Sequence, residues 1–471
     1  VLRRQEDDRR PAGGGRMSAG LRQTEYPGSV VGLDLETTGV DARTDAIIEV
    51  SAVRFENGEL RDTFTRFVDP GRPIPADVVY LTGISDDDVR GSPKIDDILP
   101  DLVEFLGDRP IVAHQASFDL AFLNAAAAGR SDLLVGRGGT IDTLVLSRAL
   151  LPRLPSHRLA ALVRFFDIPH ERAHRAEDDA LAVAVLYGKL LEVMDQLGSA
   201  ILARMAALAD SETGKLISVA RERAEGRLDP YALPDHGLRE GELLRYDNAL
   251  RIEIPREPRE DKVDVDLDSL EMLFGDGGAV AARLTGYEIR REQLQMMRAV
   301  GDALSGGIHL VVEAGTGVGK SLAYLVPAVH FAVANGERVI VSTNTRNLQE
   351  QLFQKDVPFL ERALDVPFSA ALLKGRGNYL CVQRWRQILE KGLSPSERAE
   401  LLPLVVWEEE TRSGDVSENG GFRQRGYLWG RLSAEGGPCL GQKCPFSDRC
   451  YLLEARRASQ AAHVVIVNHS L

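Results

Sequence analysis

VGLDLETTG, residues Val31 to Gly39, starts as an apolar strand and ends in two acidic side chains and a turn. We expect the strand to run from Val30 to Leu35. Because successive side chains of a strand point to opposite faces, Asp34 and Glu36 should lie on the same side of the sheet end. This stretch predicts a sheet edge that carries paired carboxylates.

The same alternation recurs downstream and predicts a meander. Strands are expected at Ile47 to Phe55 and at Thr63 to Val68, with a turn at Asn57 and Gly58. From Ile95 to about Lys189 the pattern changes to helices separated by one apolar strand, Ile111 to Ala113. The first domain is therefore expected to be α/β with a mixed sheet.

Two further acids and a histidine lie in two short downstream motifs. Asp119 lies in AHQASFD after the strand at Ile111, and Asp179 lies in HRAEDDA on a helix, shortly after His174. Phosphodiester hydrolysis needs such a set, because carboxylates hold two divalent ions about 3.5 to 4 Å apart and a base deprotonates water. An imidazole titrates near neutral pH and suits the base. Each acid taken alone could equally be a solvated surface group.

In combination these segments resemble the DEDDh exonucleases, the family of the proofreading epsilon subunit of bacterial DNA polymerase. The resemblance covers about residues 26–189 and rests on VGLDLETTG, LTGI (Leu81 to Ile84), VAHQASFDLAFL (Val112 to Leu123), IDTL (Ile141 to Leu144) and HRAEDDA (His174 to Ala180). It implies a ribonuclease H-like fold and 3′-to-5′ removal of nucleotides. It also implies that two Mg²⁺ or Mn²⁺ ions are held by Asp34, Glu36, Asp119 and Asp179, with His174 as general base. The residue after His114 is usually Asn in this family, and here it is Gln115.

A second site is indicated by AGTGVGKS. It follows an expected apolar strand, Leu310 to Glu313, and precedes a helical run from Leu322. A strand, a Gly-rich loop and a helix form the context in which backbone amides hold phosphates, lysine reaches the β and γ groups, and serine binds magnesium. A chance Gly-rich turn is the alternative. The candidate ATP–Mg²⁺ residues are Ala314, Gly315, Thr316, Gly317, Val318, Gly319, Lys320 and Ser321.

The four cysteines all lie downstream of this loop, at Cys381, Cys439, Cys444 and Cys450. A disulfide framework is not favoured in an acidic chain of this length with no apolar secretory leader. Zinc ribbons usually present cysteine pairs two residues apart, and the chain has no such pair. Single thiolates around a wide loop are more typical of an iron–sulfur cluster. A zinc ion bound by the same cysteines stays the alternative.

The segments around the loop and the cysteines resemble the DinG and XPD branch of superfamily 2 helicases. That resemblance implies a RecA-like first motor domain with a 4Fe-4S insertion beside the translocating strand, and it makes Gln293 the residue that reads adenine. VSTNTRNLQEQL, Val341 to Leu352, is similar to the strand-contacting segment. Around the first cysteine, phosphate contacts and a stacking surface could come from Lys374, Arg376, Arg384, Arg386, Tyr379 and Trp385. Each of these could also be part of a solvated face.

Charge is divided unevenly along the 471 residues. Residues 1–276 carry 34 Lys and Arg against 50 Asp and Glu, whereas residues 277–471 carry 23 against 20. The acidic front fits a site that binds metal ions, and the rear keeps cations for phosphate contacts. No apolar run is long enough to span a membrane, so we expect a cytoplasmic protein without membrane partners.

These observations predict six segments. They are a disordered arm (1–25), the exonuclease domain (26–192), a helical and charged linker (193–262), the first part of the motor domain (263–380), the iron–sulfur insertion (381–455) and a return to the motor (456–471). In the resembling helicases an acidic magnesium motif follows a segment like VVIVNHSL, so we expect an incomplete motor here.

The sequence therefore predicts a DNA repair enzyme that joins a metal-dependent 3′-5′ exonuclease to an ATP-dependent DNA helicase. Its partner is expected to be single-stranded or 3′-ended DNA, with RNA not excluded and protein partners unknown. One alternative keeps the nuclease and makes the rear half an ATP-gated strand-binding module that does not unwind duplex. A scaffold with relic sites is another.

Overall fold

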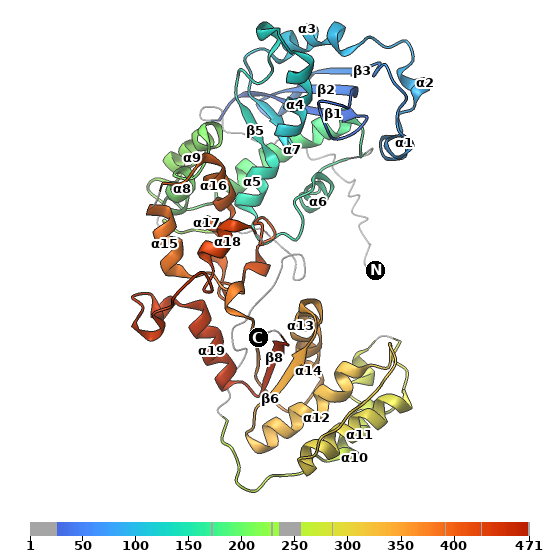
Figure 1. Cartoon of the computed structure of the whole chain (residues 1–471), viewed down its shortest axis with the longest axis vertical. Helices are drawn as coiled ribbons and strands as arrows, with labels where there is room; N and C mark the ends of the chain where they lie inside the picture. The colour runs from blue at the N-terminus through green and yellow to red at the C-terminus, as the bar shows by residue number, and fades with distance from the viewer. Residues whose placement is uncertain are drawn as a thin grey trace, which may run out of the picture. The chain divides into compact units, whose positions relative to one another are not determined.

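A computed structural model describes residues 26–170, 173–227, 229–234, 256–284, 286–390, 392–424 and 426–469. These residues divide into two compact units, Val1–Leu150 with Ser156–His236 and Leu151–Pro155 with Gly237–Leu471 (Figure 1). The predicted arm (1–25) and residues 235–255 of the predicted linker lie outside the described residues. None of the described helices combines the length and the apolar character needed to cross a membrane.

The first unit is built on a five-stranded mixed sheet in the order β3-β2-β1-β4-β5. The strands β1 to β3 form the predicted antiparallel meander, whereas β4 and β5 run parallel to β1. The turn between β2 and β3 uses Asn57 and Gly58, both with positive φ, as a tight hairpin requires. The strands are β1 (Ser29–Thr37), β2 (Ile47–Glu56), β3 (Glu59–Phe67), β4 (Ile111–Ala113) and β5 (Thr140–Asp142).

Helices cover this sheet and close its core. The long helix α7 packs against β1 and β2, and α3 packs against β2 and β3. The buried side chains between them are aliphatic and aromatic, with Leu33, Leu99 and Leu123 fully enclosed. The helices are α1 (Ala76–Thr82), α2 (Asp86–Val89), α3 (Ile95–Leu106), α4 (Ala116–Ala126), α5 (Thr143–Leu150), α6 (Leu159–Phe165), α7 (Ala176–Met194), α8 (Ser199–Ala206) and α9 (Ser211–Ala224).

The second unit contains a parallel three-stranded sheet in the order β6-β8-β7. Its strands are β6 (Val339–Thr343), β7 (Ala370–Leu372) and β8 (Val464–Asn468), so the segment between β7 and β8 carries all four cysteines. The helices are α10 (Leu267–Phe274), α11 (Arg291–Gly306), α12 (Lys320–Asn335), α13 (Arg346–Gln351), α14 (Val357–Ala363), α15 (Val382–Glu390), α16 (Pro395–Leu401), α17 (Pro403–Glu410), α18 (Tyr427–Leu432) and α19 (Tyr451–Ala461).

Two expectations about strands were wrong. The stretch at residues 310–313 forms no strand, and the side chain of Val311 is 97% exposed. An isolated apolar run needs a hydrogen-bonded neighbour to become a strand, and no described residue pairs with this one. The second error is an omission, because the short β5 in IDTL was not predicted. Its side chains alternate over only three residues, too few for a period to show.

Candidate nuclease and nucleotide sites

Three elements of the first unit bring the predicted acids together. Strand β1 carries Asp34 and Glu36, the first turn of α4 carries Asp119, and the first turn of α7 carries Asp179. Glu36, Asp119 and Asp179 are buried, and Asp34 is half-buried. Within the described residues, one group of three metal-ligating side chains has its ligand atoms within 4.8 Å of one another, and it consists of Glu36, His174 and Asp179.

The helix α7 reaches this position because β1 has a glycine beneath it. A Cβ atom on Gly32 would lie 2.4 Å from the carbonyl oxygen of Ala180. Only a residue without a side chain allows the helix backbone to approach the strand so closely. Ala180 follows Asp179, so the close crossing of the two backbones sets Asp179 beside the carboxylates of β1.

Helix α4 is held in place by Asp142, the acid of the IDTL segment. Its carboxylate accepts hydrogen bonds from the backbone amides of Gln115 and Ala116, each at 3.1 Å. This caps the helix that carries Asp119. Gln115 itself has φ 71°, a left-handed conformation in which asparagine is favoured. The departure from the family's usual asparagine therefore falls on a backbone position with a steric preference.

The electrostatics of the cluster favour bound cations. Burial, together with repulsion from Asp179 and Glu49, raises the pKa of Glu36 to about 8. Burial likewise raises the pKa of Asp119 to about 8. The pKa of Asp34 rises well above its usual value because its carboxyl is desolvated and is repelled by Asp119, Asp179 and Glu36. Carboxyls that repel one another in this way are the ligands that Mg²⁺ and Mn²⁺ stabilise in ionised form.

His174 is exposed beside these acids, and a second histidine lies close to it. The backbone amide of His174 donates to Oδ2 of Asp179 at 3.1 Å. On the other carboxylate oxygen, Nε2 of His170 lies 2.5 Å from Oδ1 of Asp179. His170 was not predicted from the sequence, and its contact with Asp179 orients that carboxylate. The spacing of four residues between two histidines ahead of an acid was the available signal.

The Gly-rich loop of the second unit is arranged for phosphate binding. Gly317 and Gly319 have φ values of 84° and 82°, which glycine adopts at little cost. Nζ of Lys320 lies over the loop and donates to the carbonyl oxygens of Ala314 and Gly315 at 3.0 and 3.2 Å. A lysine that is held on loop carbonyls in this way is near the place where phosphate oxygens would bind.

Gln293 supports the same loop from α11. Its side chain is buried and donates from Nε2 to the carbonyl oxygen of Gly319 at 3.0 Å. Its amide oxygen accepts from the Tyr287 hydroxyl at 3.2 Å. Asp356 lies on a π-helical turn, Leu352–Asp356, near Ser321, and burial raises its pKa. Asp356 was not predicted from the sequence as a site residue, and π-helical turns are common at functional sites.

The four cysteines are free thiols within the segment that links β7 to β8. Burial raises the pKa of Cys450, and the charges of Cys381 and Cys439 raise it further, so these sulfurs are neighbours. Cys381 and Cys450 also pack on the apolar residues Tyr379, Ala434, Leu452 and Ala455. The amide of Gly441 donates to Sγ of Cys439 at 3.4 Å. A partly apolar setting with amide donors to sulfur is typical of iron–sulfur sites.

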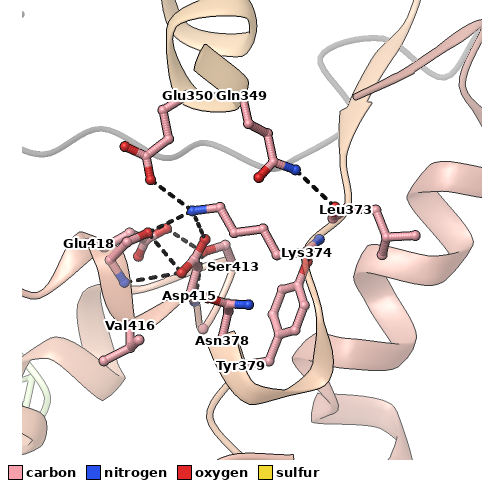
Figure 2. Close-up of polar contacts among 12 residues, drawn as sticks. Gln349, Glu350, Leu373, Lys374, Asn378, Tyr379, Ser413, Asp415, Val416 and Glu418 are labelled. Atoms are coloured by element: carbon pink, nitrogen blue, oxygen red, sulfur yellow. Dashed lines mark hydrogen bonds and ion pairs between the residues drawn. The ribbon is translucent and has the colours of Figure 1, made fainter. Parts of the chain in front are cut away.

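Three of the residues expected to contact a nucleic acid are unavailable for it. Lys374 is 3% exposed and its Nζ forms an ion pair with buried Asp415 at 2.7 Å and with Glu350 at 3.1 Å (Figure 2). Tyr379 and Trp385 are completely buried, so neither offers a stacking face. Sequence spacing could not separate these aromatic core residues from surface ones.

The structure points instead to a cavity of about 650 Å³ next to Lys374. It lies where the parallel strands end, with Asn468 at the end of β8, and binding sites of parallel sheets gather at this edge. Its charged lining includes Arg346 from the start of α13, Arg376 from the segment before Cys381, and Arg456 from α19. Arg346 and Arg456 were not singled out from the sequence.

Comparisons with known proteins give each of the two units its own family match. The exonuclease family model matches residues 31–187, and the DEAD/DEAH box helicase model matches residues 292–379. The chain is 30% identical to the 3′-5′ exonuclease DinG of Bacillus subtilis over 93% of its own length and 46% of that protein. It is 39% identical to the ATP-dependent DNA helicase YoaA of Haemophilus influenzae over 42% of its length and 31% of that protein.

A solved structure of exonuclease X with 5′ overhanging duplex DNA is 26% identical, with a TM-score of 0.28, and covers 35% of this chain and 90% of that one. The chain spans less than half the length of the DinG and YoaA relatives. Families of exonucleases and helicases generally need a divalent metal and ATP. The chain thus matches an exonuclease family model followed by a DEAD/DEAH box helicase family model, and over most of its length it is similar to the DinG exonuclease of Bacillus subtilis.

Proposed function

We propose that the first unit is a two-metal 3′-5′ exonuclease acting on single-stranded or 3′-ended DNA. The observation that carries this proposal is the convergence of Asp34, Glu36, Asp119 and Asp179. Burial raises the pKa of all four carboxyls, and repulsion within the group further raises the pKa values of Asp34 and Glu36. Two Mg²⁺ or Mn²⁺ ions held by these side chains would stabilise the attacking and leaving oxygens of the phosphodiester. RNA is a second substrate to be tested.

The residues of the chain would divide the work as follows. The four carboxylates hold the ions, and Asp142 keeps Asp119 in place by capping α4. His174, exposed at the site, takes the proton of the attacking water. His170 keeps Asp179 oriented through its 2.5 Å contact.

Digestion of a 3′-labelled single-stranded DNA tests this function. The chain with Mg²⁺ or Mn²⁺ should shorten the labelled strand, and Asp34→Asn should abolish shortening without loss of folding. Asp62→Asn, on the exposed part of β3, serves as the matched control. Metal-dependent shortening that persists in the Asp34→Asn protein would exclude this site as its source, and an inert parent protein would favour the relic scaffold.

For the second unit we propose the start of an ATP-dependent DNA helicase motor. Residues 314–321 would bind the phosphates of ATP–Mg²⁺, with Lys320 on the β and γ groups, Ser321 at the magnesium ion and Gln293 at the adenine. The arginines of the cavity, Arg346, Arg376 and Arg456, would bind strand phosphates. The alternative is an ATP-gated strand-binding module. A strand-displacement assay separates them, because only a motor displaces the strand.

Cys381, Cys439, Cys444 and Cys450 are proposed to hold a 4Fe-4S cluster. The proximity of Cys450 to Cys381 and Cys439, the apolar packing and the amide donor at Cys439 support this assignment. Protein purified without oxygen should be brown with four irons per chain, and Cys381→Ser should lose them. Colourless protein with stoichiometric zinc would contradict the cluster. A DNA-processing enzyme with reduced thiol ligands is expected in the cytoplasm.

A further inference from the structure

A fifth buried acid lies beside the nuclease cluster without being one of its predicted ligands. Glu49 is in β2 and is paired in register with Glu36 of β1. Its side chain is 1% exposed. A carboxylate so far from water must be neutralised or hydrogen-bonded, because an isolated buried charge is very unfavourable.

Glu49 receives its partners from the segment that carries His174 and Asp179. Oε1 accepts a hydrogen bond from Nη2 of Arg175 at 2.9 Å. Oε2 accepts from Nε of the same guanidinium at 3.3 Å and from the backbone amide of Ala176 at 3.1 Å. The guanidinium also lies 5.5 Å from the centre of the Phe67 ring. The contact is bidentate and has a preferred geometry.

The contact of Glu49 with Arg175 and Ala176 lies between the two site residues His174 and Asp179. Arg175 follows His174, and Ala176 begins α7, whose first turn contains Asp179. His174 has φ 63°, a left-handed conformation that a residue with a side chain adopts only when its surroundings enforce it. Glu49 accepts hydrogen bonds from Arg175 and Ala176, the two residues directly after His174. These contacts hold the turn from which the histidine side chain reaches the acids.

We propose that Glu49 and Arg175 are positioning residues of the exonuclease site, which fix His174 and the start of α7 against β2. This inference rests on the proposed nuclease function and deepens it. Arg175 also supplies a positive charge beside the acids, so that Glu49 adds no net negative charge to a cluster that already holds four carboxyls. Glu49 is outside the group of described side chains that share close ligand atoms.

Glu49→Gln tests the role with almost no change in shape. A glutamine amide cannot accept all three of these hydrogen bonds, because one of its two terminal atoms is an NH₂ donor, which would face either Nη2 of Arg175 or the donors Nε of Arg175 and the amide of Ala176. We expect kcat for DNA hydrolysis to fall about 10- to 100-fold, as for other residues that orient metal-site groups, with KM nearly unchanged. Asp96→Asn, which breaks the exposed 2.7 Å pair with Arg130 in the same unit, should retain parental kcat.

Arg175→Ala provides a second variant, and its readout is the rescue of activity by added guanidinium, which a purely structural role of Arg175 would not produce. Millimolar guanidinium should restore part of its activity by occupying the space of the lost side chain. Arg175→Lys should retain more activity than Arg175→Ala, because it keeps the charge although it loses the bidentate contact. Parental kcat in Glu49→Gln, or absence of guanidinium rescue in a folded Arg175→Ala protein, would overturn the proposal.

Hydrogen exchange separates this proposal from the nuclease assignment. In Glu49→Gln the amides of His174 and Ala176 should exchange faster than in the parent, whereas those of β4 should not change. This measurement does not depend on catalysis. If the parent protein degrades no DNA, the nuclease function fails, while faster exchange in Glu49→Gln still supports the positioning role of Glu49 and Arg175. Unchanged exchange of the His174 and Ala176 amides contradicts the positioning role even in an active enzyme.

Discussion

Nζ of Lys374 lies 2.7 Å from Oδ2 of Asp415, and both side chains are buried (Figure 2). Lys374 follows β7, whereas Asp415 belongs to the cysteine-bearing segment between β7 and β8. The other oxygen of Asp415 accepts from the amide and hydroxyl of Ser417, at 3.0 and 2.8 Å. A buried pair of this kind ties the cysteine-bearing segment to the sheet.

Removing the lysine charge should therefore destabilise the second unit. Lys374→Met leaves Asp415 buried without its cation, and we expect a loss of about 3 to 5 kcal/mol in the free energy of unfolding. Urea denaturation followed by circular dichroism measures it. The matched control is Arg457→Met, which breaks an exposed 3.2 Å pair with Glu454 and should cost less than about 1 kcal/mol. Equal losses in the two variants would contradict the role of burial.

The same segment should lose stability as the pH rises. Burial raises the pKa of Glu418 to about 7, against hydrogen bonds from Ser413 and Thr411 that lower it. A carboxyl with a raised pKa in the folded state contributes stability that is complete below its unfolded value, near 4.5, and is lost as pH rises through about 7. The difference is on the order of 3 kcal/mol.

Thermal melts between pH 5 and pH 8 measure this dependence. Glu418→Gln should flatten the profile, since glutamine keeps an acceptor for the Thr411 hydroxyl and does not titrate. A variant with the parental slope would show that other groups carry the pH dependence.

Metal binding in the first unit should strengthen with pH. The pKa values of Glu36 and Asp119 are about 8 in the metal-free site, so protons compete with the ions below that pH. Calorimetric titration with Mn²⁺ should give a higher affinity at pH 8.5 than at pH 6.5, with proton release that is larger at pH 6.5. An affinity independent of pH would show that the acids are ionised without metal.

The approach of α7 to β1 should tolerate no side chain at Gly32. In Gly32→Ala the new Cβ would meet the carbonyl oxygen of Ala180, and we expect loss of nuclease activity together with a lowered melting temperature. Gly188→Ala is the control in the same helix, because nothing lies within 4 Å of a Cβ there. It should be neutral or stabilising by about 0.5 to 1 kcal/mol. An active, stable Gly32→Ala protein would show that the helix can shift without cost.

Local patterns determined the meander and the order of the acidic motifs. Strands β1 to β3 were predicted to within four residues of their ends, and their Asn57–Gly58 turn was predicted at the same residues, because alternation and positive φ are local properties. Asp34 and Glu36 were placed on one side of β1 for the same reason. The spacing of the glycines around Lys320 likewise marked the loop before α12.

Burial and long-range pairing were decided only by the tertiary structure. Residues 310–313 are apolar yet form no strand, and Tyr379 and Trp385 are buried where an exposed stacking surface was expected. The contact of Glu49 with Arg175 joins residues 126 positions apart, and the cavity gathers Arg346, Arg376 and Arg456 from three separate segments. A sequence lists side chains in order along one dimension, whereas their desolvation and their partners depend on which backbones pack together in space.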